Sequence, residues 1–122
     1  MKTRESEEMY LETILLLKKR KSGVRSVDIV EELGYAKSSV SRAVNLLQKK
    51  GYITVNAGEI ALSESGLKKA EGVYEKHRVL TRSLVLMGAD PLLAEQNACR
   101  IEHVISAEMF EIIKKFIESK EK

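Results

Sequence analysis

Apolar residues recur at helical spacing near the start of the chain. Tyr10, Ile14 and Leu17 lie three or four residues apart, and this spacing predicts a helix over residues 5–19. Four consecutive cations at residues 18–21 suit the C-terminus of that helix, where positive charge meets the negative end of the helix dipole.

Two further apolar stripes lie on either side of Gly34. They predict a helix over residues 26–33, with Ser26 as its N-cap, and a second helix over residues 37–49. Gly34 is suited to end the first helix and begin a tight turn. Two helices joined in this way are typical of a helix-turn-helix, although an ordinary helical hairpin is the simpler alternative.

The outward face of the second helix carries short hydrogen-bond donors and one arginine, without an acidic residue. This composition favours contact with DNA phosphates and base edges. We therefore expect the following residues to contact DNA: Arg25, Ser26, Ala36, Lys37, Ser38, Ser39, Ser41 and Arg42.

Two β-rich runs follow, at residues 52–55 and 59–62, and they flank Asn56-Ala57-Gly58. Apolar and β-branched runs around a turn with Asn and Gly predict a β-hairpin. A helix-turn-helix followed directly by a hairpin is the order of a winged helix. Because two independent patterns agree, the ordinary hairpin of helices becomes the weaker interpretation.

The rest of the chain predicts three helices. Ser63 is suited to cap a long helix over residues 64–86, and Asp90-Pro91 is suited to begin a helix over residues 90–103. Ser106 is suited to cap the last helix. The apolar stripe of this last helix includes Met109, Ile112, Ile113, Phe116 and Ile117. The last two of these helices carry more apolar positions than one small lobe can hide, so we expect a homodimer formed through this half.

Charge and composition narrow the class of protein. The net charge of +3 does not by itself indicate a nucleic-acid partner, but residues 17–51 hold nine Lys or Arg against three Asp or Glu. The single cysteine excludes an intrachain disulfide. We see no signal peptide and no apolar run that would span a bilayer, so we expect a soluble, cytoplasmic protein without membrane contact.

One short stretch carries metal-ligand chemistry. In a helix, Cys99, Glu102 and His103 lie at positions i, i+3 and i+4, so their side chains leave one face. A thiol, a carboxylate and an imidazole together suit a transition metal. Taken singly, each has a simpler interpretation: a small buried cysteine, a solvated charge and a partly buried histidine.

Several motifs in a consistent order resemble the diphtheria toxin repressor family, which includes iron-dependent and manganese-dependent regulators. The match covers nearly the whole chain, in a short form without the family's SH3-like domain. Its most specific parts are Glu8-Met9-Tyr10-Leu11-Glu12, Ser38-Ser39-Val40-Ser41-Arg42, Leu62-Ser63-Glu64-Ser65-Gly66, Lys76-His77-Arg78 and the run from Ala98 to Ser106.

The resemblance implies a mainly α fold, with a winged helix-turn-helix DNA-binding domain over residues 1–72 and an all-α dimerisation and metal-binding domain over residues 73–122. It implies a primary metal site and a second site. The primary ligands would be Met9, Cys99, Glu102 and His103; the second site would hold His77, with Glu12 and Glu95 beside it. The second site departs from the iron-type pattern, which has a carboxylate where this chain has Thr81 and a histidine where it has Glu95.

The expected function is that of a transcriptional repressor, not an enzyme, that binds operator DNA as a homodimer when loaded with metal and controls metal-uptake genes. The soft sulfur ligands favour Fe(II), with Mn(II) as the alternative. A metal-independent or a thiol-sensing winged-helix regulator is the rival function. A metallohydrolase is disfavoured, because the chain has no HExxH motif and little room for a substrate pocket, so no small-molecule substrate is expected.

Overall fold

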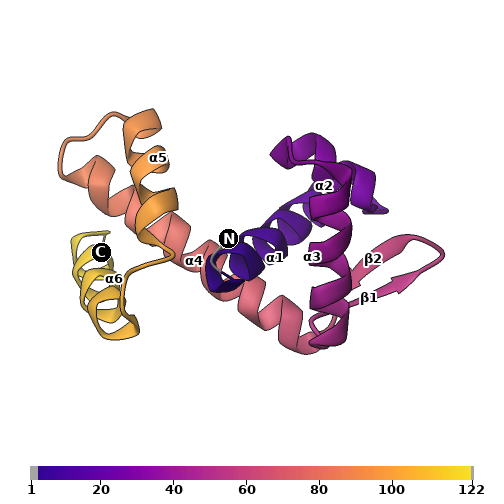
Figure 1. Ribbon diagram of the computed structural model, residues 1–122. Helices are drawn as coiled ribbons and strands as arrows, with labels where there is room; N and C mark the ends of the chain where they lie inside the picture. The colour runs from indigo at the N-terminus through magenta and orange to yellow at the C-terminus, as the bar shows by residue number, and fades with distance from the viewer. Residues whose placement is uncertain (1–2, 122) are drawn as a thin grey trace. The chain divides into compact units, whose positions relative to one another are not determined.

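A computed structural model describes residues 3–121, with side chains described from Glu7 onward, and it is mainly helical with one small antiparallel sheet (Figure 1). The expected fold class is confirmed. The chain divides into two compact units, Met1–Glu71 and Gly72–Lys122, and each is described by itself. Within residues 3–121, no helix is both long enough and apolar enough to cross a membrane.

The N-terminal unit is built on three helices. Helix α1 (Thr3–Arg20), helix α2 (Ser26–Leu33) and helix α3 (Lys37–Lys49) contact one another and enclose an apolar core. The predicted stripes of α1 and α3 point inward, because periodic apolar residues on a helix reach a common core. On α2 the expected stripe is not buried: Val27 is 48% exposed, and Ile29 is buried instead. The core side chains from these helices are Tyr10, Leu11, Ile14, Leu15, Leu17, Ile29, Val40, Ala43, Val44 and Leu47.

Gly34 makes the turn of the helix-turn-helix. It caps α2 with φ 70°, in the left-handed region, and its amide donates to the Val30 carbonyl at 2.8 Å. Glycine adopts this conformation without a clash at Cβ, so the chain can reverse within a few residues. Helix α3 then begins at Lys37, as the pattern predicts.

The wing is the hairpin of β1 (Ile53–Asn56) and β2 (Glu59–Leu62), which projects from the helices of this unit (Figure 1). Ile53 pairs with Leu62 and Asn56 with Glu59. Ala57 and Gly58 both have positive φ, at 51° and 82°, as a two-residue turn of the type I′ class requires. An additional bridge joins Val24 to Ile60, so the segment before α2 extends the sheet.

The start of helix α4 (Glu64–Leu86) is fixed against the wing by its glycine. Ser63 caps the helix as predicted, since its hydroxyl accepts from the Gly66 amide at 3.1 Å. A Cβ on Gly66 would lie 1.9 Å from the Tyr52 carbonyl oxygen. Only glycine therefore permits this close approach of helix and strand.

The C-terminal unit holds the remainder of α4 together with α5 (Pro91–Ile101) and α6 (Ala107–Glu121) (Figure 1). Asp90 and Ser106 cap α5 and α6, as predicted. Not all of the expected α6 stripe is buried. Ile117 is buried, but Met109, Ile112 and Phe116 are at least 44% exposed.

Helix α2 begins differently from the prediction. Ser26 is the first helical residue and Arg25 is the N-cap. The cap bond comes from Asp28, whose carboxylate accepts from the Arg25 amide at 2.8 Å and pairs with Lys21 at 2.7 Å. The expectation that Ser26 is the N-cap is therefore wrong, because a carboxylate in the first turn reaches back to the open amide.

Asp28 should make stability depend on pH. The Lys21 ammonium, with help from the Arg25 amide, holds the pKa of Asp28 below its usual value. Because the pKa is lower in the folded chain, this stabilisation is complete above the unfolded value near 3.9 and is lost as the pH falls through the folded value. We expect Asp28→Ala to lower the free energy of unfolding by about 1 kcal/mol at pH 7. The difference from the parent should shrink at pH 3, as measured by urea unfolding.

Candidate functional site

The centre of the C-terminal unit is the carboxylate of Glu102. Ala94 and Ala98, which are fully buried, precede it at intervals of four residues on the same face of α5. Glu102 continues this inward stripe and is only 1% exposed. Glu102 thus places a carboxylate at a buried position where an apolar side chain is usual.

The predicted helix over residues 90–103 is two residues too long. Helix α5 ends at Ile101, and Glu102 is its C-cap. The Glu102 amide still donates to the Ala98 carbonyl at 2.9 Å, whereas the Val104 and Ile105 amides both turn back to the Ile101 carbonyl at 3.0 Å. His103 therefore lies in a turn rather than in the continuous helix that the pattern predicts.

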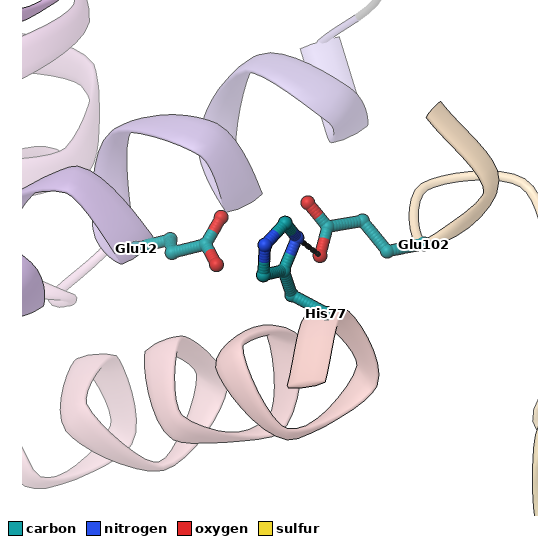
Figure 2. A group of neighbouring side chains, drawn as sticks. All are labelled: Glu12, His77 and Glu102. Carbon is teal, nitrogen blue, oxygen red and sulfur yellow. Dashed lines mark ion pairs between the residues drawn. The ribbon is translucent and has the colours of Figure 1, made fainter. Parts of the chain in front are cut away.

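Two imidazoles face the Glu102 carboxylate. The Nδ1 atom of His77, from the middle of α4, lies 3.4 Å from Glu102 Oε2, and the Nε2 atom of His103 lies 3.5 Å from Oε1. Figure 2 shows the His77 ring directed at the carboxylate. Glu12, which is also labelled there, belongs to α1 in the N-terminal unit.

This arrangement fits a bound cation. Among residues 7–121, neither Glu102 oxygen accepts a hydrogen bond, although both are buried. The distances to nitrogen exceed those of good hydrogen bonds. Ligand atoms held at about 2.1 Å from one metal ion lie roughly 3.0–3.4 Å from each other, close to the spacing seen here. A buried carboxylate that faces an imidazole is donor chemistry for a divalent transition metal. The ligand atoms of His77 and Glu102 belong to one group that could hold an ion, whereas His103 does not belong to that group.

The other predicted ligands have different surroundings. Cys99 is exposed, although it lies only three residues before Glu102. Glu95 is also exposed and lines a pocket of about 240 Å³ with His77, Thr81 and two arginines. The structure thus brings His77 and His103 to Glu102, whereas the resemblance assigns His77 to a second site.

Met9 and Glu12 lie on α1 in the N-terminal unit, and both are half-buried. Tyr35, in the turn before α3, donates its hydroxyl to the Met9 sulfur at 3.5 Å. Its ring also packs edge-on against Tyr10, with centroids 6.3 Å apart. The sequence did not single out Tyr35, because nothing in its local pattern predicts contact with a residue 26 positions earlier.

The residues expected to contact DNA lie mostly on the surface of the N-terminal unit. The α3 residues Ser38, Ser41 and Arg42 are exposed, and Ser39 is half-buried. Before them, Ala36 and Lys37 are exposed at the start of the helix, where open amides and the helix dipole favour a phosphate.

At the start of α2, Ser26 is half-buried and Arg25 is exposed. The Arg25 guanidinium makes a hydrogen bond within the unit, to the Ala57 carbonyl at 3.0 Å. The same side chain that was expected to meet DNA therefore also contacts the wing.

Comparisons with known proteins agree with this architecture. Residues 2–58 match the family described as "Iron dependent repressor, N-terminal DNA binding domain", and residues 63–122 match "Iron dependent repressor, metal binding and dimerisation domain". An uncharacterized HTH-type transcriptional regulator of Methanocaldococcus jannaschii is 31% identical over 117 residues, covering 93% of this chain and 94% of the relative.

A second transcriptional regulator and a solved repressor are also similar. The HTH-type transcriptional regulator MntR of Lysinibacillus sphaericus is 31% identical over 83% of this chain and 73% of its own length. A solved manganese-dependent transcriptional repressor complexed with manganese shares the fold, with a TM-score of 0.84 and 23% identity over 92% of this chain and 52% of that chain. From the two domain matches and these relatives, the chain belongs to the iron-dependent repressor family of metal-dependent transcriptional regulators, which are not enzymes.

Proposed function

We propose that this protein is a metal-activated repressor that binds operator DNA as a homodimer and controls metal-uptake genes. The observation that carries this proposal is the buried Glu102 carboxylate facing the imidazoles of His77 and His103. Such a group is stabilised by a cation, so metal availability changes the stability of the regulatory unit.

The proposed metal ligands lie on α1 and in the C-terminal unit. Glu102, His77 and His103 provide the ligands of the C-terminal unit, and Glu12 and Met9 provide those of α1. Cys99 and Glu95, which the resemblance adds as ligands, are both exposed side chains of α5. When bound, the metal would supply a positive charge shared by carboxylate and imidazole ligands.

The proposed dimer interface lies in the C-terminal unit. The end of α4, the turn after it and the start of α5 expose five apolar side chains, of which Met87 is the most exposed, at 78%. The five residues are Val85, Leu86, Met87, Leu92 and Leu93. A second copy of this chain would cover them, since contiguous exposed apolar side chains usually mark an interface.

Dimerisation explains how a metal can control DNA binding. Two recognition helices in a dimer must be about 34 Å apart to enter successive major grooves on one face of the DNA. Metal binding favours the spacing that fits DNA only to the extent that the metal binds that form more tightly. About 1.4 kcal/mol of such coupling changes DNA affinity tenfold, which is modest for metal–ligand bonds.

The metal requirement is tested by Glu102→Gln. This change keeps the shape of the side chain but removes the buried charge, so metal affinity should fall by more than about a hundredfold, because even outer-shell partners are worth 10–100-fold. Isothermal titration with Mn(II), and fluorescence anisotropy on a DNA fragment from the gene's own upstream region, measure the two effects. Glu118→Gln, at an exposed carboxylate of α6, is the matched control. Full operator affinity of the parent protein in excess EDTA would contradict the proposal.

The recognition helix is tested by two cation variants. Arg42→Ala should weaken operator binding by about 1–3 kcal/mol and relax the sequence preference at one position, because we expect Arg42 to read a base edge. Lys37→Ala should weaken all DNA sequences similarly and flatten the dependence on salt, because we expect Lys37 to meet the backbone. Competition binding with altered operators separates the two. Unchanged operator affinity in Arg42→Ala would mean that α3 is docked in another way.

The metal preference follows from sulfur ligands. The Cys99 thiolate and the Met9 thioether are soft donors, whereas Mn(II) prefers oxygen, so we propose Fe(II) as the effector and Mn(II) as the alternative. Met9→Asp together with Cys99→Glu should shift activation of DNA binding toward Mn(II). Anaerobic anisotropy titrations with each metal test this. A parent protein that responds to less Mn(II) than Fe(II) would show that the buried oxygen and nitrogen ligands, not the sulfurs, set the preference.

A further inference from the structure

The wing has no cation of its own. Residues 52–62 include Glu59 but no lysine or arginine. Contacts between a protein and DNA phosphates are made largely by cations and by backbone or hydroxyl donors. A wing of this composition therefore needs a positive charge from elsewhere if it is to lie against the DNA backbone.

Arg25 supplies that charge at the wing tip. Its Nη1 donates to the Ala57 carbonyl at 3.0 Å, and Ala57 is the first of the two turn residues with positive φ. The bond joins positions 32 residues apart, from the N-cap of α2 to the tip of the hairpin. One donor of the guanidinium is used in this way, and an arginine side chain has five.

The backbone of Arg25 is itself held firmly. Its amide donates to the Asp28 carboxylate at 2.8 Å. On its other side, the Val24 carbonyl accepts from the Ile60 amide at 2.8 Å, within the bridge that joins Val24 to the wing. Lys18 adds a bond to the Ile60 carbonyl at 3.2 Å. The base from which Arg25 reaches the turn is thus tied to both α2 and β2.

Gly58 is the second observation that points to the same contact. A Cβ at this position would lie 2.3 Å from Arg25 Nη1. The glycine leaves the space that the guanidinium occupies, in addition to allowing the φ of 82° that the turn needs. Gly51, which has a similar φ of 80°, has no heavy atom within 4 Å of such a Cβ.

We infer that Arg25 is the positioning residue of the wing: it fastens the tip of the β1–β2 hairpin to the start of α2 and places a cation at that tip. The inference rests on the proposed DNA-binding function and deepens it. Bound in this way, the guanidinium restricts the hairpin before DNA arrives, so less conformational entropy is lost on binding. Its remaining donors are available for a phosphate.

The first test uses the free protein. Arg25→Ala should speed hydrogen exchange of the amides of Asn56 and Glu59, which flank the turn, by about threefold to tenfold, as expected for loss of one hydrogen bond. Arg20→Ala is the matched control, because it removes an arginine of the same unit that pairs with Glu32 instead. Unchanged exchange in Arg25→Ala, or equal acceleration in both variants, would overturn the inference.

The second test uses the glycine. Gly58→Ala should push the guanidinium off the Ala57 carbonyl and also strain the turn at φ 82°, so its exchange at the wing should be at least as fast as that of Arg25→Ala. Gly51→Ala, which imposes a similar backbone strain without a nearby guanidinium, should leave the wing unchanged. The double variant Arg25→Ala, Gly58→Ala should exchange more slowly than the product of the two single effects by about threefold, because Gly58→Ala strains the turn in either background but the Arg25 contact can be lost only once. Fully multiplicative effects would mean that Gly58 acts independently of Arg25.

DNA affinity separates this inference from the proposed function. In anisotropy titrations with metal present, Arg25→Ala and Gly58→Ala should both weaken operator binding by about threefold or more, although Gly58→Ala retains the arginine charge. If Gly58→Ala binds as tightly as the parent while Arg25→Ala does not, Arg25 is a phosphate contact alone and the positioning role is wrong. If the parent protein binds no DNA, the proposed function fails, and the exchange measurements still decide how the wing is held.

Discussion

Burial of the Glu102 carboxylate is the constraint on which the proposed regulation depends. A charged oxygen without hydrogen bonds inside a protein is unfavourable by several kcal/mol unless an opposite charge lies close to it. Glu102 is placed there because it continues the stripe of buried Ala94 and Ala98. The His77 and His103 imidazoles face its two oxygens, so the carboxylate lies beside groups that can share a cation with it.

The N-terminal unit has a different constraint: α3 and the wing, which are proposed to contact DNA, must be held in fixed positions. Its apolar core orients α3, and two close contacts that require glycine fix the elements around the wing. At Gly66 the helix α4 approaches the Tyr52 carbonyl, and at Gly58 the turn leaves room for Arg25. These two contacts add to the apolar packing, and they limit the movement of the wing that is proposed to lie against DNA.

The two units also differ in how much apolar surface they expose. Apolar residues of α1 and α3 are mostly buried within their own unit, whereas α4, α5 and α6 leave large apolar side chains open, with Leu86 and Ile112 among them. An amphipathic helix is stabilised by covering its apolar face. The C-terminal unit thus has the surface that the family's dimerisation domain would be expected to offer.

The local pattern of the sequence determined the helices, the turn at Gly34, the hairpin and the caps at Ser63, Asp90 and Ser106, because period, turn chemistry and capping act over only a few residues. It failed at Ser26, where Asp28 competes for the cap, and at the end of α5, where a turn replaces the last helical residues.

The same local signals identified Glu102 as a candidate metal ligand, with a solvent-exposed carboxylate as the simpler alternative. Its position four residues after Ala98 nevertheless indicated that it is buried. Only the tertiary structure decided that His77 faces Glu102, that Tyr35 reaches Met9 and that Arg25 reaches Ala57. These pairs are between 25 and 32 residues apart, as their numbers show. No short-range periodicity specifies them, because contacts at that separation are set by how whole elements pack.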